Sequence, residues 1–265
     1  MALPVLDVLP RLMEVAREAA HAAALVGMKH WRKLERVERK ADGSPVTVAD
    51  REAEAAAVAI LERGCPGVAI LGEEGGLRGG EGATRWIVDP LDGTIGYSRG
   101  GVMWGPLVAL EHDGAIVVGA MELPVIRAAY WAGRGLGCFR DGERVRVSTT
   151  DQWPRAILSL GGMKRAMFDH VRGAAVESLV RTSRTSRAYG DVGSCAMLLD
   201  GTADVWIEAG VQVWDLAAPR ILVEEAGGRF TDFDGVPGHT TGEAIASNGA
   251  LHAHVVASFA SARPR

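Results

Sequence analysis

Cysteine is scarce in this chain of 265 residues: Cys65, Cys138 and Cys195 stand far apart, and no C-x-x-C pair occurs. An odd number of widely spaced cysteines favours reduced thiols over a disulfide framework or a zinc site. No run of 18 apolar residues exists, so no membrane-spanning helix is predicted. The first ten residues include Asp7 and no positively charged segment, which argues against a secretory signal. These absences predict a cytoplasmic protein without a membrane partner.

A concentrated patch of positive charge is also missing. The formal net charge is −4, and no block of lysine and arginine interleaved with aromatic residues occurs. The basic tract 29–40 is interrupted by glutamates, as is typical of a solvated helix face. A nucleic-acid partner is therefore not expected. What is present is an ordinary globular composition, 48% hydrophobic and 23% charged, in a chain long enough for one large domain or two closely packed ones.

Hydrophobic patterning predicts two helices and then an antiparallel sheet. Apolar residues recur at helical spacing over Pro10–Leu34. Thr47 is expected to cap a second helix, with Asp50 as its reciprocal partner. Six apolar runs then predict strands: Val68–Leu71, Arg85–Asp89, Trp104–Glu111, Ile116–Met121, Ala128–Trp131 and Arg144–Ser148. Asp113-Gly114 is typical of a hairpin, whereas the glycine-rich segment Gly72–Gly82 is predicted to be a loop.

After about residue 150, predicted strands alternate with predicted helices. The strands are Ile157–Leu160, Ala203–Glu208 and Arg229–Phe233, and the helices are Lys164–Val180, Asp191–Asp200, Val213–Ala226 and a last one beyond Asn248. The sequence therefore predicts an α+β fold. Residues 1–150 form an N-terminal α+β half with an antiparallel sheet, and residues 151–265 form an α/β half, packed together as one compact catalytic unit.

The most informative segment is Asp89-Pro90-Leu91-Asp92-Gly93-Thr94. It follows an apolar strand run that ends at Val88, and the residues after it can open a helix. Two carboxylates three residues apart offer the oxygen ligands that Mg²⁺ prefers, and the free N–H groups at a helix start favour a phosphate. The segment therefore predicts a metal-dependent phosphoryl-transfer site in the N-terminal half.

Two further acidic segments stand where predicted elements end or begin. Glu73-Glu74 follows the strand run 68–71, and Trp214-Asp215 opens an alanine-rich helix. If these carboxylates meet those of the central motif, their mutual repulsion requires a cation. Two metal ions that share a carboxylate can activate water and stabilise the leaving oxygen of an in-line displacement.

A second phosphatase chemistry uses a similar motif. Phosphatases of the haloacid-dehalogenase type carry Asp-x-Asp-Gly-Thr, in which the first aspartate is the nucleophile. Here that position is Pro90, so the chain has no nucleophile for a covalent aspartyl phosphate, and metal-bound water is the better attacker. No P-loop occurs, and residues 133–137 do not follow the dinucleotide-binding fingerprint.

Together, Glu73-Glu74, the segment 89–94 and Trp214-Asp215-Leu216-Ala217-Ala218 resemble the signatures of the inositol monophosphatase family. Their order and spacing agree with that family, and the resemblance extends from the first helix to about Leu251. It implies a layered αβαβα sandwich and Mg²⁺-dependent hydrolysis of a small phosphate monoester, usually by a homodimer. Two to three Mg²⁺ ions are expected in each active site.

The resemblance also implies the metal ligands. Glu73, Asp89 and the carbonyl of Leu91 are expected to bind the first metal. Asp89, Asp92 and Asp215 are expected to hold the second, so that Asp89 bridges the two ions.

Further matched residues are implied to act on water and substrate. Glu73 and Thr94, with Asp50 behind Thr94, are expected to orient the attacking water. The N–H groups of Gly93 and Thr94 are expected to hold the phosphate. Lys40 matches a family lysine near the mouth of the active site.

Within the family, three segments are most similar to the histidinol-phosphatase branch: Arg99-Gly100, Trp104 and 186–191, which includes Arg187. Asp191, at the end of that segment, is expected beside the phosphate pocket. A carboxylate there suits a substrate with a positive amine better than a neutral polyol.

Glu208 matches a position that contacts substrate across the family. Two departures from the histidinol-phosphatase pattern fall beside it: Val192-Gly193 replaces a common aromatic, and Glu208-Ala209-Gly210 replaces an acidic-Pro pair. They keep a phosphate of inositol or another cyclitol, an aminocyclitol, a sugar or a nucleotide as the alternative substrate. A catalytically silent regulatory binding protein is the alternative from a different class, but the complete metal set favours an enzyme.

Overall fold

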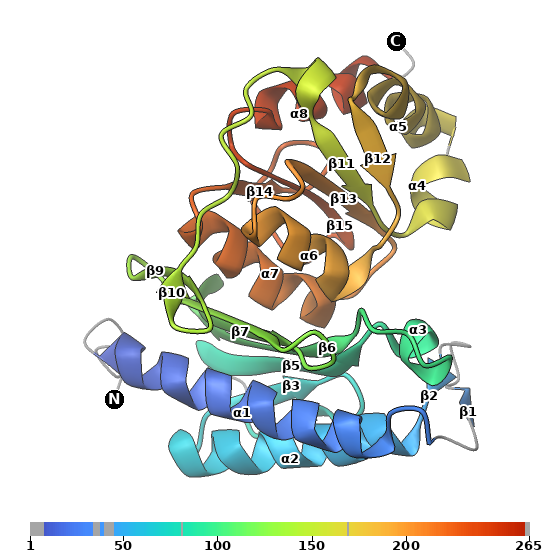
Figure 1. The fold of residues 1–265 in the computed structure, drawn as a ribbon. Helices are drawn as coiled ribbons and strands as arrows, with labels where there is room; N and C mark the ends of the chain where they lie inside the picture. The colour runs from blue at the N-terminus through green and yellow to red at the C-terminus, as the bar shows by residue number, and fades with distance from the viewer. Residues whose placement is uncertain (1–7, 34–37, 40–44, 81, 169, 263–265) are drawn as a thin grey trace.

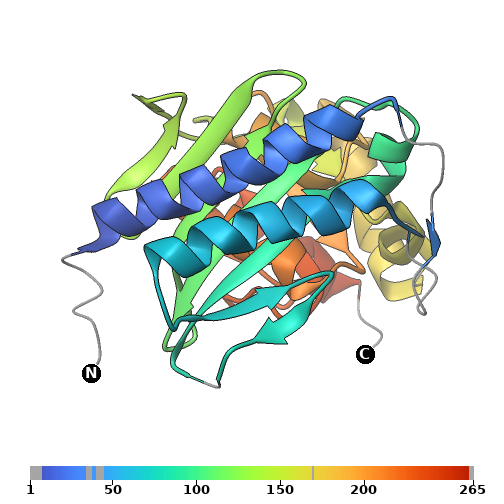
Figure 2. The ribbon, with the colours of Figure 1, turned by 90° about the horizontal axis from the view of Figure 1, so that it is seen from below.

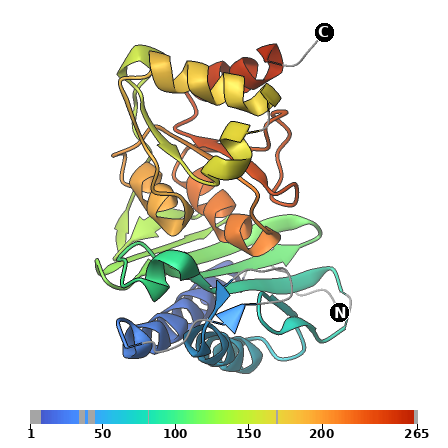
Figure 3. The ribbon, with the colours of Figure 1, turned by 90° about the vertical axis from the view of Figure 1, so that its right-hand side faces the viewer.

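The computed structural model describes residues 8–33, 38–39, 45–80, 82–168 and 170–262. Helices and sheets alternate in layers from one side of the molecule to the other, as Figures 1 and 3 show. The predicted αβαβα sandwich is confirmed. No helix within the described ranges combines the length and the apolar character that crossing a membrane requires.

The first layer consists of α1 (Leu9–His30) and α2 (Val48–Gly64), which run side by side across the outer face of the larger sheet (Figure 2). Small buried side chains on both helices, among them Ala16 and Ala57, allow the two helices to approach closely. The predicted capping box is present: Thr47 caps α2, and its N–H donates to Asp50 Oδ2 at 2.7 Å. The cap fixes where α2 begins and therefore where Asp50 lies.

The larger sheet is built from strands that precede residue 150. They are β3 (Ala69–Gly72), β4 (Gly76–Arg78), β5 (Thr84–Asp92), β6 (Gly105–His112), β7 (Ala115–Leu123), β8 (Ala128–Gly133), β9 (Gly137–Arg140) and β10 (Glu143–Arg144). Their order is β10-β9-β8-β7-β6-β5-β3-β4, and only β3 and β5 pair in parallel. A separate two-stranded sheet joins β1 (Glu38–Arg39) and β2 (Pro45–Val46).

The central helices α6 (Asp191–Leu199) and α7 (Val213–Glu225) separate the larger sheet from a second one (Figure 1). That second sheet has the order β12-β11-β13-β15-β14. Its strands are β11 (Ile157–Leu160), β12 (Thr185–Arg187), β13 (Val205–Ala209), β14 (Arg229–Thr231) and β15 (Glu243–Ser247). Because helices cover both of its faces, strand β13 is buried at every residue and β11 at every residue but Ile157.

Four shorter or peripheral helices complete the described structure. They are α3 (Thr94–Ser98), α4 (Met163–Phe168), α5 (His170–Thr182) and α8 (His252–Ser261), and a 3₁₀ turn spans Trp153–Arg155. Helices α5 and α8 form the outer layer on the far side of the second sheet (Figure 3). The two sheets thus lie on either side of the predicted boundary near residue 150, and the division into halves stays a prediction.

Three predicted elements differ from the structure. The strand expected over Arg144–Ser148 ends at Arg144, because the chain then leaves the sheet and the Val147 N–H donates to the Ala226 carbonyl at the end of α7. The single helix expected over Lys164–Val180 is described as two helices, α4 and α5. The segment Gly72–Gly82, expected to be a loop, contains strand β4. Strands β1, β2, β9, β12 and β15 were not predicted.

Candidate active site

An irregularity in β5 brings Asp89 and Asp92 together. Residues three apart in a regular strand point to opposite faces of a sheet. Here the pairing of β5 with β6 shifts register between Asp89 and Asp92, and Pro90, which has no N–H to donate, lies within the shift. The Asp89 carboxylate accepts the Leu91 N–H at 2.8 Å, and the Asp92 carboxylate accepts the Val192 N–H at 2.7 Å. Both carboxylates are buried and held in place.

Asp215 joins this pair from the first turn of α7. Its Oδ2 accepts the N–H of Gln212 at 2.6 Å, as part of the cap that begins the helix. One carboxylate oxygen from each of Asp89, Asp92 and Asp215 lies within 4.8 Å of the other two. Carboxylate oxygens at this spacing suit a hard divalent cation.

The electrostatics of the three aspartates also fit a cation. Burial, followed by the charge of Glu73, raises the pKa of Asp89 well above its usual value. Burial, followed by the charge of Asp191, does the same for the pKa of Asp92. Burial raises the pKa of Asp215 to about 6, although the Gln212 N–H and a hydrogen bond with Asp89 lower it. These shifts favour the protonated forms of the three aspartates, so a bound divalent ion would compete with protons and favour the charged forms.

Glu73 approaches the cluster from the turn between β3 and β4. Its N–H donates to the Val88 carbonyl at 3.0 Å, which fixes it beside the residue that precedes Asp89. Its charge raises the pKa of Asp89 and of Asp215, so it lies close enough to act on both. Its role as a metal ligand stays a prediction.

Thr94 and Asp50 also meet, although they are 44 residues apart in sequence. The Thr94 hydroxyl lies 3.1 Å from Asp50 Oδ1 and 3.1 Å from the Leu91 carbonyl, and it can donate to either. Gly93, between β5 and α3, has φ of 85°, and a Cβ there would lie 3.0 Å from the Met103 carbonyl. The turn that presents the Gly93 and Thr94 N–H groups therefore requires glycine.

Two more carboxylates, Asp191 and Glu208, lie close enough to the cluster for their charges to raise the pKa of Asp92. Asp191 begins α6 and has φ of 51°. Its N–H lies 3.4 Å from Glu208 Oε2, and the N–H of the next residue, Val192, donates to Asp92. Glu208 is buried, and its Oε2 also accepts the Trp206 indole N–H at 3.1 Å. Burial, followed by the charge of Asp191, raises the pKa of Glu208 to about 8. A positive charge beside these two carboxylates would lower both pKa values.

Two other residues, Arg187 and Lys40, were predicted to contact the substrate. Arg187 is exposed on the edge strand β12, and its Nη1 donates to Thr185 Oγ1 and to the Ser186 carbonyl, both at 2.7 Å. Its contact with substrate stays a prediction. Lys40 lies outside the described residues.

Sequence reasoning missed Glu54, a buried residue of α2. Its Oε2 accepts the Glu74 N–H at 2.7 Å, in the turn that carries Glu73. The signal that points to it is its spacing: it follows Asp50 by four residues, so the two side chains leave the same face of α2.

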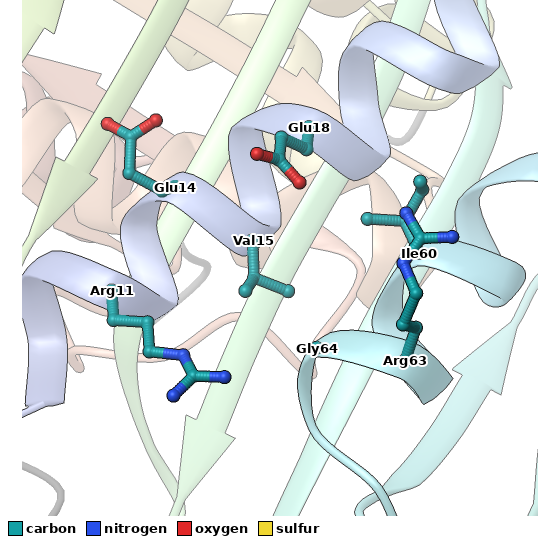
Figure 4. Close-up of a pocket in the computed structure, with 7 residues that line it drawn as sticks. All are labelled: Arg11, Glu14, Val15, Glu18, Ile60, Arg63 and Gly64. Carbon is teal, nitrogen blue, oxygen red and sulfur yellow. The ribbon is translucent and has the colours of Figure 1, made fainter.

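A depression of about 300 Å³ between α1 and α2 is separate from this site (Figure 4). It is lined by Arg11, Glu14, Val15, Glu18, Ile60, Arg63 and Gly64. Arg63 and Asp50 are near opposite ends of α2, and 13 residues of helix span about 20 Å. The depression is lined by two arginines and two glutamates, and it is too far away to belong to the carboxylate cluster.

Comparison with known proteins identifies the framework that carries these residues. The family model described as the inositol monophosphatase family matches residues 9–263. The chain belongs to this family. Two similar relatives are named histidinol-phosphatase. The one from Mycobacterium tuberculosis is 40% identical over 226 residues, 83% of this chain and 86% of that protein. The one from Streptomyces coelicolor is 37% identical over 255 residues, 91% and 93% of the two chains.

A solved structure of an inositol monophosphatase from Anabaena has the same fold. It superposes with a TM-score of 0.85 at 29% sequence identity, over 97% of this chain and 98% of that one. These comparisons confirm the predicted class of enzyme, a phosphoric monoester hydrolase, at the level of the family. The carboxylate cluster occupies the part of the chain that carries the recognised motifs.

Proposed function

We propose that the chain is a Mg²⁺-dependent phosphatase that hydrolyses histidinol phosphate. The observation that carries the proposal is the arrangement of acidic groups. Three aspartates suited to a cation lie together, and the acidic pair of Asp191 and Glu208 lies beside them. Mg²⁺, when bound, would lower the pKa of water and neutralise the charge on the phosphoryl oxygens.

The residues of the chain supply the geometry for this reaction. Glu73, Asp89, Asp92, Asp215 and the Leu91 carbonyl are proposed to hold two to three Mg²⁺ ions between the β5 bulge and the start of α7. Holding these oxygens in place before substrate arrives lowers the cost of ordering them during the reaction.

Thr94 is proposed to orient the water that attacks phosphorus. When its hydroxyl donates to Asp50, its oxygen lone pairs are free to accept a hydrogen bond from that water. Asp50 is itself fixed by the Thr47 N–H at 2.7 Å. The Gly93 and Thr94 N–H groups are proposed to bind the phosphate, which keeps phosphorus in line with the water.

The substrate assignment rests on charge. Histidinol phosphate carries an ammonium group next to the phosphoester carbon, whereas inositol phosphate offers hydroxyl groups. An ammonium near Asp191 and Glu208 would favour their charged forms, which burial otherwise disfavours. Each charged hydrogen bond contributes roughly 1.5–3 kcal/mol. The names of the two relatives from Mycobacterium tuberculosis and Streptomyces coelicolor support the same choice.

We expect kcat/KM to be about ten- to a hundredfold higher for histidinol phosphate than for inositol 1-phosphate. Both values are measured side by side from phosphate release in Mg²⁺. Asp191→Asn should shrink this preference without abolishing hydrolysis of a generic aryl phosphate. Asp113→Asn is the matched control, because Asp113 also has a positive φ, 49°, but lies on an exposed hairpin turn.

Equal values, or a preference for the inositol compound, would overturn the histidinol assignment and leave the phosphatase chemistry standing. The departures at Val192 and Ala209 keep an inositol or other cyclitol, aminocyclitol, sugar or nucleotide phosphate as the alternative substrate in that case. A protein that releases no phosphate from any of these esters would support the regulatory binding protein instead.

We also propose a homodimer in the cytoplasm. Leu25, Val102 and Ile126 expose large apolar side chains on three neighbouring segments. These segments are held together by the His21–Glu122 contact, 3.1 Å, and by the Trp31 indole, which donates to the Gly101 carbonyl at 2.9 Å. The three cysteines are free, which agrees with a reducing compartment. Light scattering at micromolar concentration should give twice the chain mass of 28.0 kDa. A species of single-chain mass only would contradict the dimer.

A further inference from the structure

Glu54 is a charged side chain with only 2% of its surface exposed. It follows Asp50 on the same face of α2, and each of the two carboxylates contacts a different segment of the site. Asp50 Oδ1 accepts from Thr94 at 3.1 Å, and Glu54 Oε2 accepts the Glu74 N–H at 2.7 Å. One helix thus contacts both the motif on β5 and the turn that carries Glu73.

The turn between β3 and β4 is shaped to fit the Glu54 carboxylate. A Cβ on Gly72 would lie 2.5 Å from Glu54 Oε2, and a Cβ on Gly75 would lie 2.5 Å from Oε1. Both glycines therefore leave the space that the carboxylate fills. Arg78, from β4, brings Nη2 to 3.4 Å from Glu54 Oε1 and supplies positive charge to a group that is otherwise buried.

Glu73 stands between these contacts. Its own N–H is bound to Val88 of β5, and the following N–H, that of Glu74, is bound to Glu54. The backbone that carries the Glu73 side chain is therefore fixed from β5 and from α2. We infer that Glu54 is a positioning residue for Glu73: it holds the turn 72–75 in the conformation in which Glu73 binds the metal. This inference rests on the proposed metal-dependent function.

The test is the divalent-metal affinity of Glu54→Gln, measured by titration calorimetry with Mn²⁺ on the full-length protein. Glutamine keeps the shape, but its neutral amide oxygen is a weaker acceptor for the Glu74 N–H than the carboxylate is, and its NH₂ group would face Arg78. Loss of a group that orients a metal ligand typically weakens metal binding by about 10- to 100-fold, so we expect a rise of that size in the dissociation constant. The Mg²⁺ concentration for half-maximal phosphate release should rise with it, with a smaller change in kcat at saturating Mg²⁺.

Two substitutions on the same helix serve as controls. Val58→Ala removes part of a buried side chain, 4% exposed, and should lower the melting temperature while Mn²⁺ affinity stays that of the wild type. Glu62→Gln changes an exposed glutamate and should alter neither quantity. If Glu54→Gln behaves like Val58→Ala, with a lower melting temperature and normal Mn²⁺ affinity, Glu54 only stabilises the fold and the inference is wrong.

Arg78→Gln decides the question if Glu54→Gln does not fold. The Arg78 side chain is 48% exposed, so its loss should leave the fold intact. We expect Mn²⁺ affinity about two- to fivefold weaker, the range of a partly exposed ion pair, and unchanged affinity would overturn the inference. Wild-type protein that binds no Mn²⁺ and releases no phosphate would refute the proposed function, and the inference with it. Normal wild-type binding with unaffected variants would overturn the inference alone.

Discussion

Replacement of Asp92 by asparagine should lower kcat by at least about a thousandfold while the protein stays folded. The asparagine oxygen can still accept the Val192 N–H that Asp92 Oδ2 accepts at 2.7 Å. Its amide nitrogen would then point toward Asp89 and Asp215, where a cation needs an oxygen ligand. The substitution thus removes a charge and turns one acceptor into a donor at the point where the metal is proposed to bind.

Stability should respond in the opposite sense in metal-free protein. Burial raises the pKa of Asp92, so the charged carboxylate is unfavourable there without a cation, and a neutral amide avoids that cost. The melting temperature of Asp92→Asn in EDTA at pH 8 should therefore equal or exceed that of the wild type. Steady-state kinetics in Mg²⁺ and calorimetry in EDTA provide the two measurements.

Asp113→Asn makes the same replacement of aspartate by asparagine away from the site. Asp113 lies near the start of β5, whereas Asp92 lies at its end. Thr94→Ala should cost less activity than Asp92→Asn, since Thr94 is proposed to orient water rather than to bind the ion. Near-normal kcat in folded Asp92→Asn would show that Asp92 is not a metal ligand.

The sequence predicted those residues of the site that belong to a distinctive local motif. The Asp89–Thr94 motif predicted a strand that ends in carboxylates before a helix, and β5 and α3 follow that order. The Thr47–Asp50 cap was predicted from spacing alone because a capping box depends on residues three apart. Such features need no knowledge of distant segments.

Other features depend on tertiary structure and leave little trace in the sequence. The register shift that brings Asp89 and Asp92 to one side arises from how β5 pairs with β6. In the sequence, Glu54 resembles any glutamate of an amphipathic helix. Its contact with the turn after β3 depends on the tertiary structure. The raised pKa of Glu208 results from burial and from the charge of Asp191, which lies at the start of α6, whereas Glu208 lies on β13.

The strands that were missed have the same explanation. Strand β15, Glu243–Ser247, contains two alanines and a single β-branched residue, Ile245, so its local preference for a strand is weak. It is nevertheless central, because β13 and β14 pair with its two edges and bury it. The opposite error occurred at Arg144–Ser148, where β-branched residues predicted a strand but the chain crosses to α7 instead.

Removal of the metal with EDTA should abolish phosphate release and should also make stability depend on pH. Burial raises the pKa of Asp89 and Asp92 well above normal, that of Asp215 to about 6 and that of Glu208 to about 8. In the unfolded chain the same groups titrate near pH 4. Between about pH 4 and pH 8 the folded protein therefore binds more protons than the unfolded chain, so its stability falls as pH rises through that window.

A divalent cation should reverse this trend. Because Mg²⁺ binds the deprotonated carboxylates, protons compete with it at pH 5 and hardly compete at pH 8. The rise in melting temperature on adding Mg²⁺ should therefore be larger at pH 8 than at pH 5, and Mg²⁺ added in excess over EDTA should restore phosphate release. Calorimetry from pH 5 to pH 8, with EDTA and then with Mg²⁺, measures the first effect. Activity that survives chelation, or an equal gain in melting temperature at both pH values, would contradict a metal site built from these carboxylates.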